Sequence, residues 1–215
     1  MWINILLVLI FFACFASLMG GGLWGNTLTL VNVLTAALLA TNYYEPLADY
    51  FESQDASFTY VWDFLAIWLI FIIAMVVLRA ATDYMSTVKV RFFPPVEKVG
   101  GILMACWVSW IVVCFATMTL HTAPLARSFL GGSFQPEADA KMLFGLVPDR
   151  VWLGWVHRES KGALCRLSDV APFDARGDFI LRYGNRRAEF EKELKLTRST
   201  GSAAKTSGMP AMPAP

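Results

Sequence analysis

Two histidines and four cysteines are the side chains best suited to metal binding or covalent chemistry in this 215-residue sequence. His121 and His157 have no carboxylate and nucleophile nearby at the spacing of a zinc site or a catalytic triad. Cys106 and Cys114 are about 12 Å apart along one predicted helix, too far for a disulfide bond or a shared metal ion. The spacing therefore predicts neither a metal site nor a disulfide framework.

The remaining reactive candidate is Cys165, which precedes Arg166. A cationic neighbour favours the thiolate form of a cysteine, although an ordinary thiol is the simpler interpretation. The sequence contains no GxSxG motif, phosphate-binding loop or HExxH motif. These observations predict a protein that is not an enzyme and binds no cofactor.

Charged side chains next to apolar segments are functional candidates, because ionisable groups inside a membrane are costly to bury. Asp63 and Arg79 bracket an uncharged stretch and are separated by about 24 Å of helix, so each can reach a different membrane interface. Arg79 and Asp83 have the i,i+4 spacing of a helical ion pair. We interpret all three as interfacial charges, with a proton or substrate path as the alternative.

Small and polar residues recur on one face of two predicted membrane helices. Such a face allows helices to approach closely and to form hydrogen bonds within the bilayer. Asn26 and Asn32 are the deepest strongly polar side chains, and we interpret them as interhelical contacts. The candidate helix-packing residues are Gly21, Gly25, Thr29, Asn32, Gly101, Ala105 and Ser109. Gly21 and Gly25 also form a GxxxG spacing, but the run of glycines 20–22 favours a turn over a dimer motif.

The elements that must position these residues are apolar helices. Hydrophobic residues make up 56% of the chain and charged residues only 16%, and four of the 18 Lys and Arg residues precede His121. This predicts an all-α membrane protein whose region 1–121 has four transmembrane helices, at about 2–19, 25–43, 61–81 and 99–120. A cleavable signal peptide is the alternative for the first of these, although no basic residue precedes it. The net charge of +1 argues against a nucleic-acid partner.

The region that follows, 122–198, is a polar tail, which we predict to be mostly irregular. It contains a segment at about 148–167 that begins with Pro and Asp and predicts a short amphipathic helix against the bundle or in the interface. The charged stretch 176–198 is consistent with an exposed helix or a disordered arm. The Pro-, Ala- and Ser-rich end, 199–215, predicts disorder.

The distribution of basic residues predicts the orientation. The connection between the second and third helices has no Lys or Arg, whereas the next connection carries Arg79, Lys89, Arg91 and Lys98. The positive-inside rule places the latter in the cytoplasm, and four spans then put both termini outside.

Several short motifs resemble those of the colicin V production (CvpA) family of bacterial inner-membrane proteins, over roughly residues 1–121. They are Trp2-Ile3-Asn4, the glycine turn at 20–22, the stretch LTLVNVLTAALLATNYYEPL from Leu28 to Leu47, and Val99-Gly100-Gly101. The sequence departs from the family pattern in four ways. An acidic residue common near the start is Asn4, the basic residue common after the first helix is missing, and the usual glycine and arginine of the fourth helix appear among Ala105, Val108 and Ser109.

The resemblance implies a multi-pass protein of the bacterial inner membrane that is associated with the production or export of a peptide toxin and with envelope processes. The residues are compatible with two roles. The first is an accessory or scaffold protein whose partners are the lipid bilayer and either a second copy or envelope and secretion proteins. The second is a small oligomeric channel or carrier, for which few polar groups lie at membrane depth.

Overall fold

Every regular element of the protein is helical in the residues that the computed structural model describes, namely 2–55, 58–86, 90, 92–125, 143–161 and 173–207. Side chains are described as far as Leu196. The helices are α1 (Trp2–Leu18), α2 (Gly22–Gln54), α3 (Thr59–Met85), α4 (Pro94–Thr122), a 3-10 turn (Leu143–Gly145), α5 (Pro148–Glu159) and α6 (Phe179–Ser207).

The first four helices correspond to the four predicted spans. Of these, α2, α3 and α4 are long and apolar enough to cross a membrane. The remaining helix, α1, is apolar but has only 17 residues, which is about 25 Å of helix. The largest boundary difference is in α2, which stays helical to Gln54 through Pro46, past the predicted end near residue 43.

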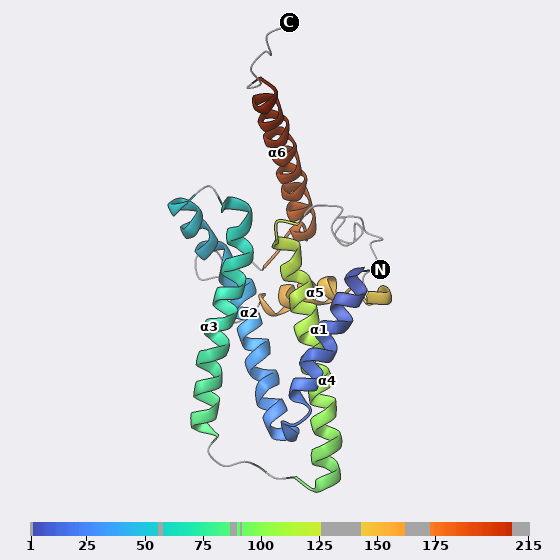
Figure 1. Cartoon of the computed structure of the whole chain (residues 1–215). Helices are drawn as coiled ribbons and strands as arrows, with labels where there is room; N and C mark the ends of the chain where they lie inside the picture. Colours follow the sequence, from blue (N-terminus) through green and yellow to red (C-terminus); the bar gives the residue numbers. More distant parts are fainter. Residues whose placement is uncertain are drawn as a thin grey trace, which may run out of the picture.

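The four helices run alternately down and up (Figure 1). One end of the bundle, here called the turn end, contains the α1–α2 turn at 19–21 and the connection between α3 and α4. The opposite end, here called the tail end, contains the start of α1, the end of α4, and helices α5 and α6. In Figure 1, α5 crosses the bundle and α6 projects away from it.

The bundle buries small and aromatic side chains between α2, α3 and α4 and leaves large apolar side chains outside. Phe115 of α4 packs edge-on against Trp68 of α3 and Trp152 of α5, with ring centroids 5.8 and 5.6 Å apart. Exposed apolar residues form an outer surface on α3 that is suited to lipid: Leu65, Leu69, Ile72, Ile73, Val76 and Val77. This arrangement is expected in a bilayer, where the solvent itself is apolar.

The tail is more helical than its composition predicted. The amphipathic helix α5 begins at Pro148 as expected and lies against the bundle, and the end of the predicted segment, 162–167, lies outside the described residues. The 29-residue helix α6 agrees with the exposed helix that was one of the two alternatives for 176–198, and it continues to Ser207 into the segment predicted to be disordered. Adding residues to an existing helix costs little, because each new residue gains a hydrogen bond. Residues 208–215 lie outside the described range.

Candidate functional site at the two ends of the bundle

Asn26 joins three helices at the turn end. Its side chain is only 1% exposed, and its Nδ2 donates hydrogen bonds to the carbonyl oxygens of Leu18 (3.1 Å) and Gly101 (2.8 Å). These bonds tie the end of α1 and the start of α4 to α2. In a bilayer such an amide links helices through hydrogen bonds to their backbone carbonyl groups.

The backbone of α4 approaches the α1–α2 turn closely at Gly101. A Cβ atom at this position would lie 3.1 Å from the carbonyl carbon of Gly22, which is itself in a left-handed conformation with φ +66°. Two further predicted packing residues, Ala105 and Ser109, are fully buried on α4, and the Ser109 hydroxyl donates to the Ala105 carbonyl at 2.7 Å. Small residues therefore set the distance between α4 and its neighbours.

The small and polar residues predicted on one face of α2 have two different surroundings. Asn32 reaches another helix, because its Nδ2 donates to the Thr82 hydroxyl of α3 at 3.0 Å. Thr29 instead donates to the Gly25 carbonyl of its own helix at 2.9 Å, and a Cβ on Gly25 would meet no atom within 4 Å. Gly25 therefore faces an open space, and Thr29 borders the same space.

That space is a pocket of about 410 Å³ at the turn end. Gly21, Gly25 and Thr29 line it together with Arg79 and Asp83 of α3. The Arg79 and Asp83 side chains are 3.7 Å apart and mostly exposed, so this ion pair adds little to stability. Five predicted residues thus border this pocket, whereas Asn32 bonds to Thr82 and Asp63 lies at the tail end.

A buried chain of hydrogen bonds joins α4, α5 and α6 at the tail end. His121 Nε2 lies 3.0 Å from Asp149 Oδ2, and Arg187 Nη2 lies 3.0 Å from His121 Nδ1. Because a guanidinium can only donate, Nδ1 accepts the hydrogen bond and Nε2 carries the proton that it donates to Asp149. The three side chains are almost inaccessible, with Arg187 only 3% exposed.

Asp149 is the ionised member of this chain of hydrogen bonds. Burial alone would raise the pKa of its carboxyl group, but the hydrogen bond from His121 and the nearby Arg150 together hold the pKa below its usual range. The negative charge of Asp149 and the positive charge of Arg187 then balance across a neutral imidazole.

A second polar cluster links α6 to α2 and α3. Asp63 Oδ2 accepts hydrogen bonds from the Tyr183 hydroxyl at 3.0 Å and from Arg186 Nη1. The Tyr183 hydroxyl also lies 3.0 Å from the Tyr44 hydroxyl, and Arg182 pairs with Glu45 at 3.1 Å. Asp63, predicted as an interfacial charge, therefore meets a specific partner in the tail.

The other reactive candidates from the sequence lie apart from one another. His157 Nδ1 donates to the Phe173 carbonyl at 2.8 Å, Cys114 is buried in the core, and Cys106 is exposed on α4. Cys165 lies outside the described residues. Among the residues that the structure describes, no three His, Cys, Asp or Glu side chains are grouped to hold a metal ion.

The matched region covers the whole bundle. A model of the Colicin V production protein family matches residues 3–135. The chain belongs to the colicin V production protein family. No curated protein and no solved structure matches the chain.

In this member of the colicin V production protein family, the positions expected to depart from the family pattern contact neighbouring segments. Asn4 Oδ1 accepts a hydrogen bond from the Leu143 backbone N–H at 3.0 Å, which fixes the segment leading into α5. Ala105, Val108 and Ser109 are all almost fully buried in the fourth helix. The positions are therefore occupied by side chains that fill space between helices.

Most residues of the tail-end clusters were missed from sequence. Tyr44 and Glu45 lie in the stretch 28–47 that carries the family resemblance, but the sequence assigned them no contact. His121 and Arg187 are likewise separated from their partners by many residues. The sequence does show acidic residues without nearby basic residues at the end of α2 and the start of α3. It also shows more basic than acidic residues in the tail. That signal indicates attraction between the regions without identifying the pairs.

Proposed function

We propose that this protein is an accessory or scaffold protein of the bacterial inner membrane, without enzymatic activity, that assists the production or export of a peptide toxin. In this proposal α6 is the element that contacts an envelope or secretion protein. Membership of the colicin V production protein family supports the link to toxin production.

The observation that carries the proposal is the way α6 is held. Its first turns are anchored to α2, α3 and α4 through polar contacts, of which His121 with Arg187 is buried and Asp63 with Arg186 is partly buried. Its later turns project from the bundle (Figure 1), and Leu196 is 66% exposed. A rigidly anchored helix that extends beyond the membrane domain is suited to reach a partner.

The proposed topology has four spans, with the tail outside the cytoplasm. The basic residues of the connection between α3 and α4 support a cytoplasmic turn end. The short helix α1 can cross by local thinning of the bilayer at modest cost. Labelling of Cys165 in intact cells by a membrane-impermeant thiol reagent tests this, with the other three cysteines replaced by Ala. Labelling only after permeabilisation would place the tail in the cytoplasm.

Complementation tests the function. A host that lacks its own family member and carries a colicin V plasmid would receive the full chain or a chain ending at Glu191, which keeps Arg186 and Arg187. We expect the full chain to restore toxin release and the shortened chain to reach the membrane without restoring it. A control in which 192–207 are replaced by an Ala- and Lys-rich helix separates loss of a partner surface from loss of length. Full activity of the shortened chain would contradict the proposal.

The pocket at the turn end favours a second candidate, a small oligomeric channel or carrier. The pocket is lined by polar side chains and opens beside Arg79 and Asp83. Ion flux in proteoliposomes that is abolished by Gly25→Leu, which would fill the pocket, would support this role. Absence of flux in the unmodified protein would leave the accessory role as the better proposal.

A further inference from the structure

The segment that leads into α5 presents large apolar side chains on the outside of the protein. This segment, residues 143–147, consists of the 3-10 turn and the link to α5 and is here called the apolar turn. Phe144 is 83% exposed and Leu146 is 58% exposed. Neighbouring apolar side chains of this size that remain exposed indicate a contact with another apolar surface.

The backbone of the apolar turn is held in an uncommon conformation against α1. Leu143, Phe144 and Val147 have φ angles of 46°, 57° and 46°, which residues other than glycine rarely adopt. The Leu143 side chain is buried in one cluster with Leu7 of α1, and its backbone N–H donates to Asn4 Oδ1 at 3.0 Å. Leu143 therefore fixes the turn on α1, while Phe144 stays outside.

The end of α1 that holds this turn belongs to a surface suited to lipid. Trp2, Ile5, Leu9 and Phe12 recur at helical spacing and are all exposed. Tryptophan is favoured where hydrocarbon meets the lipid headgroups, and Trp2 lies at the end of the helix. The start of α5 lies next to the N-terminal end of α1 (Figure 1). The apolar turn thus extends the lipid-facing surface of α1.

The length of α1 gives this extension a physical purpose. Its 17 residues make about 25 Å of helix, whereas the hydrocarbon core is about 30 Å thick. Apolar side chains just beyond the helix end can supply the missing few ångströms. Irregular backbone at that depth needs hydrogen-bond partners within the protein. Here the Leu143 N–H bonds to Asn4, and the Leu146 N–H bonds to the Leu143 carbonyl at 3.1 Å.

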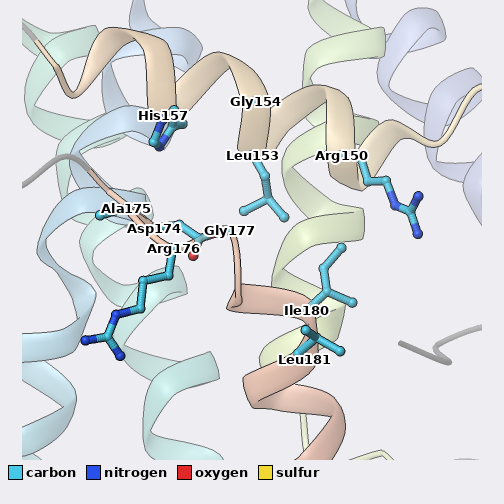
Figure 2. Close-up of a pocket in the computed structure, with 10 residues that line it drawn as sticks. All are labelled: Arg150, Leu153, Gly154, His157, Asp174, Ala175, Arg176, Gly177, Ile180 and Leu181. Carbon is cyan, nitrogen blue, oxygen red and sulfur yellow. The ribbon is translucent and has the colours of Figure 1, made fainter. Parts of the chain in front are cut away.

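The later part of α5 makes its contacts with the protein itself. Trp152 is buried, and its Nε1 donates to the Thr41 hydroxyl of α2 at 3.2 Å. Leu153 of α5 and Ile180 of α6 point toward one another across a pocket of about 700 Å³ (Figure 2). These contacts direct α5 toward α2 and α6, and they leave the side chains of Phe144 and Leu146 for a different apolar surface.

We propose that the apolar turn inserts into the lipid bilayer beside the N-terminal end of α1 and completes the apolar length of this short helix. Phe144 and Leu146 lie at the boundary between headgroups and acyl chains, the depth that the apolar faces of interfacial helices reach. The partner is the lipid surface. The inference holds for either orientation of the tail and does not depend on a role in toxin production.

A fluorescent label in the full-length protein tests this. The four native cysteines are replaced by Ala, Leu146→Cys is labelled with an environment-sensitive fluorophore, and the protein is reconstituted in vesicles of phosphatidylethanolamine and phosphatidylglycerol. Leu196→Cys is the matched control, because Leu196 is a similarly exposed leucine on the projecting part of α6 (Figure 1). We expect lipids with a nitroxide near the headgroup to quench the label at 146, and aqueous iodide to quench it about fivefold less than the label at 196.

Equal quenching by iodide at the two positions would overturn the proposal, because the apolar turn would then lie in water. A label at 146 that neither quencher reaches would also overturn it, since a second copy or another protein segment would then cover the turn.

Bilayer thickness gives an independent test without a label. Phe144→Asn with Leu146→Gln removes the apolar surface, and asparagine suits the left-handed backbone at 144 better than phenylalanine does. We expect hydrogen exchange in the first two turns of α1 to become about threefold faster in a bilayer of long-chain lipids and to change little in one of short-chain lipids. Leu196→Gln is the control. The same change in both bilayers, or in the control, would contradict the proposal.

Discussion

The two ends of the helix bundle are held by different kinds of contact. At the turn end, neutral amides and small residues bring backbones together, as Asn26 and Gly101 show. At the tail end, polar and charged side chains that lie far apart in sequence pair in buried or partly buried positions, as Asp63 does with Arg186 and His121 with Arg187. The pairs that Glu45, Asp63 and His121 form with α5 and α6 all join the family-matched region to a residue beyond position 135. The turn end therefore depends on close packing of small residues, whereas tail docking adds polar and charged pairs to the apolar contacts of Trp152 and Phe179.

The largest expected effect comes from removing Arg187. Arg187→Ala leaves the buried His121 and Asp149 without their cationic partner, which we expect to weaken docking of α6 by roughly 2–4 kcal/mol. Hydrogen exchange of the first three turns of α6 measures this, with the turn end as an internal reference. The exposed Arg158→Ala serves as the control. Unchanged protection of α6 in Arg187→Ala would show that charge does not hold the tail.

The second comparison uses two glycines of the turn end. Gly101→Ala forces a Cβ against the Gly22 backbone, and we expect a loss of roughly 1–2 kcal/mol in the free energy of unfolding in detergent. Gly25→Ala meets open space and should be neutral or stabilising by up to about 1 kcal/mol, because alanine favours helix. Equal effects of the two substitutions would refute close packing as the basis of this end.

A smaller effect is expected from the two asparagines. Asn26→Leu removes two interhelical hydrogen bonds and should cost about 1 kcal/mol, whereas Asn32→Leu removes one and should cost about half as much. Thermal unfolding monitored by circular dichroism compares the two variants. A larger loss for Asn32→Leu would place the main polar contact between α2 and α3 rather than at the junction of three helices.

The smallest effect on stability is expected from a change of pH between 8 and 5. Because the pKa of Asp149 is lowered on folding, its ionised form contributes stability above the ordinary carboxyl range. That contribution is lost as pH falls below about 4 and through the lowered pKa. Hydrogen exchange of α5, corrected for intrinsic rates, should therefore change little from pH 8 to 5. Asp149→Asn should remove part of the acid dependence, and a transition near pH 6 would contradict this assignment.

Sequence patterns predicted the membrane helices well because helices in lipid must satisfy their own backbone hydrogen bonds and carry long apolar runs. The boundaries of α2 were less predictable, since Pro46 and the acidic residues after it usually suggest a helix end. The tail was underestimated for a related reason. Composition describes the isolated segment, but α6 is stabilised in part by what its first turns contact on the bundle.

The sequence by itself determined the all-α membrane architecture, the family, and the presence of small and polar faces on α2 and α4, because these follow from local composition and helical periodicity. Only the tertiary structure decided which residues meet. Asn26 of α2 bonds to α1 and α4, whereas Gly25 faces open space. Arg186 pairs with Asp63, and Arg187 pairs with His121. The physical reason is that the interaction of charges depends on distance and burial in space, and separations of more than 60 residues along the chain carry no information about either.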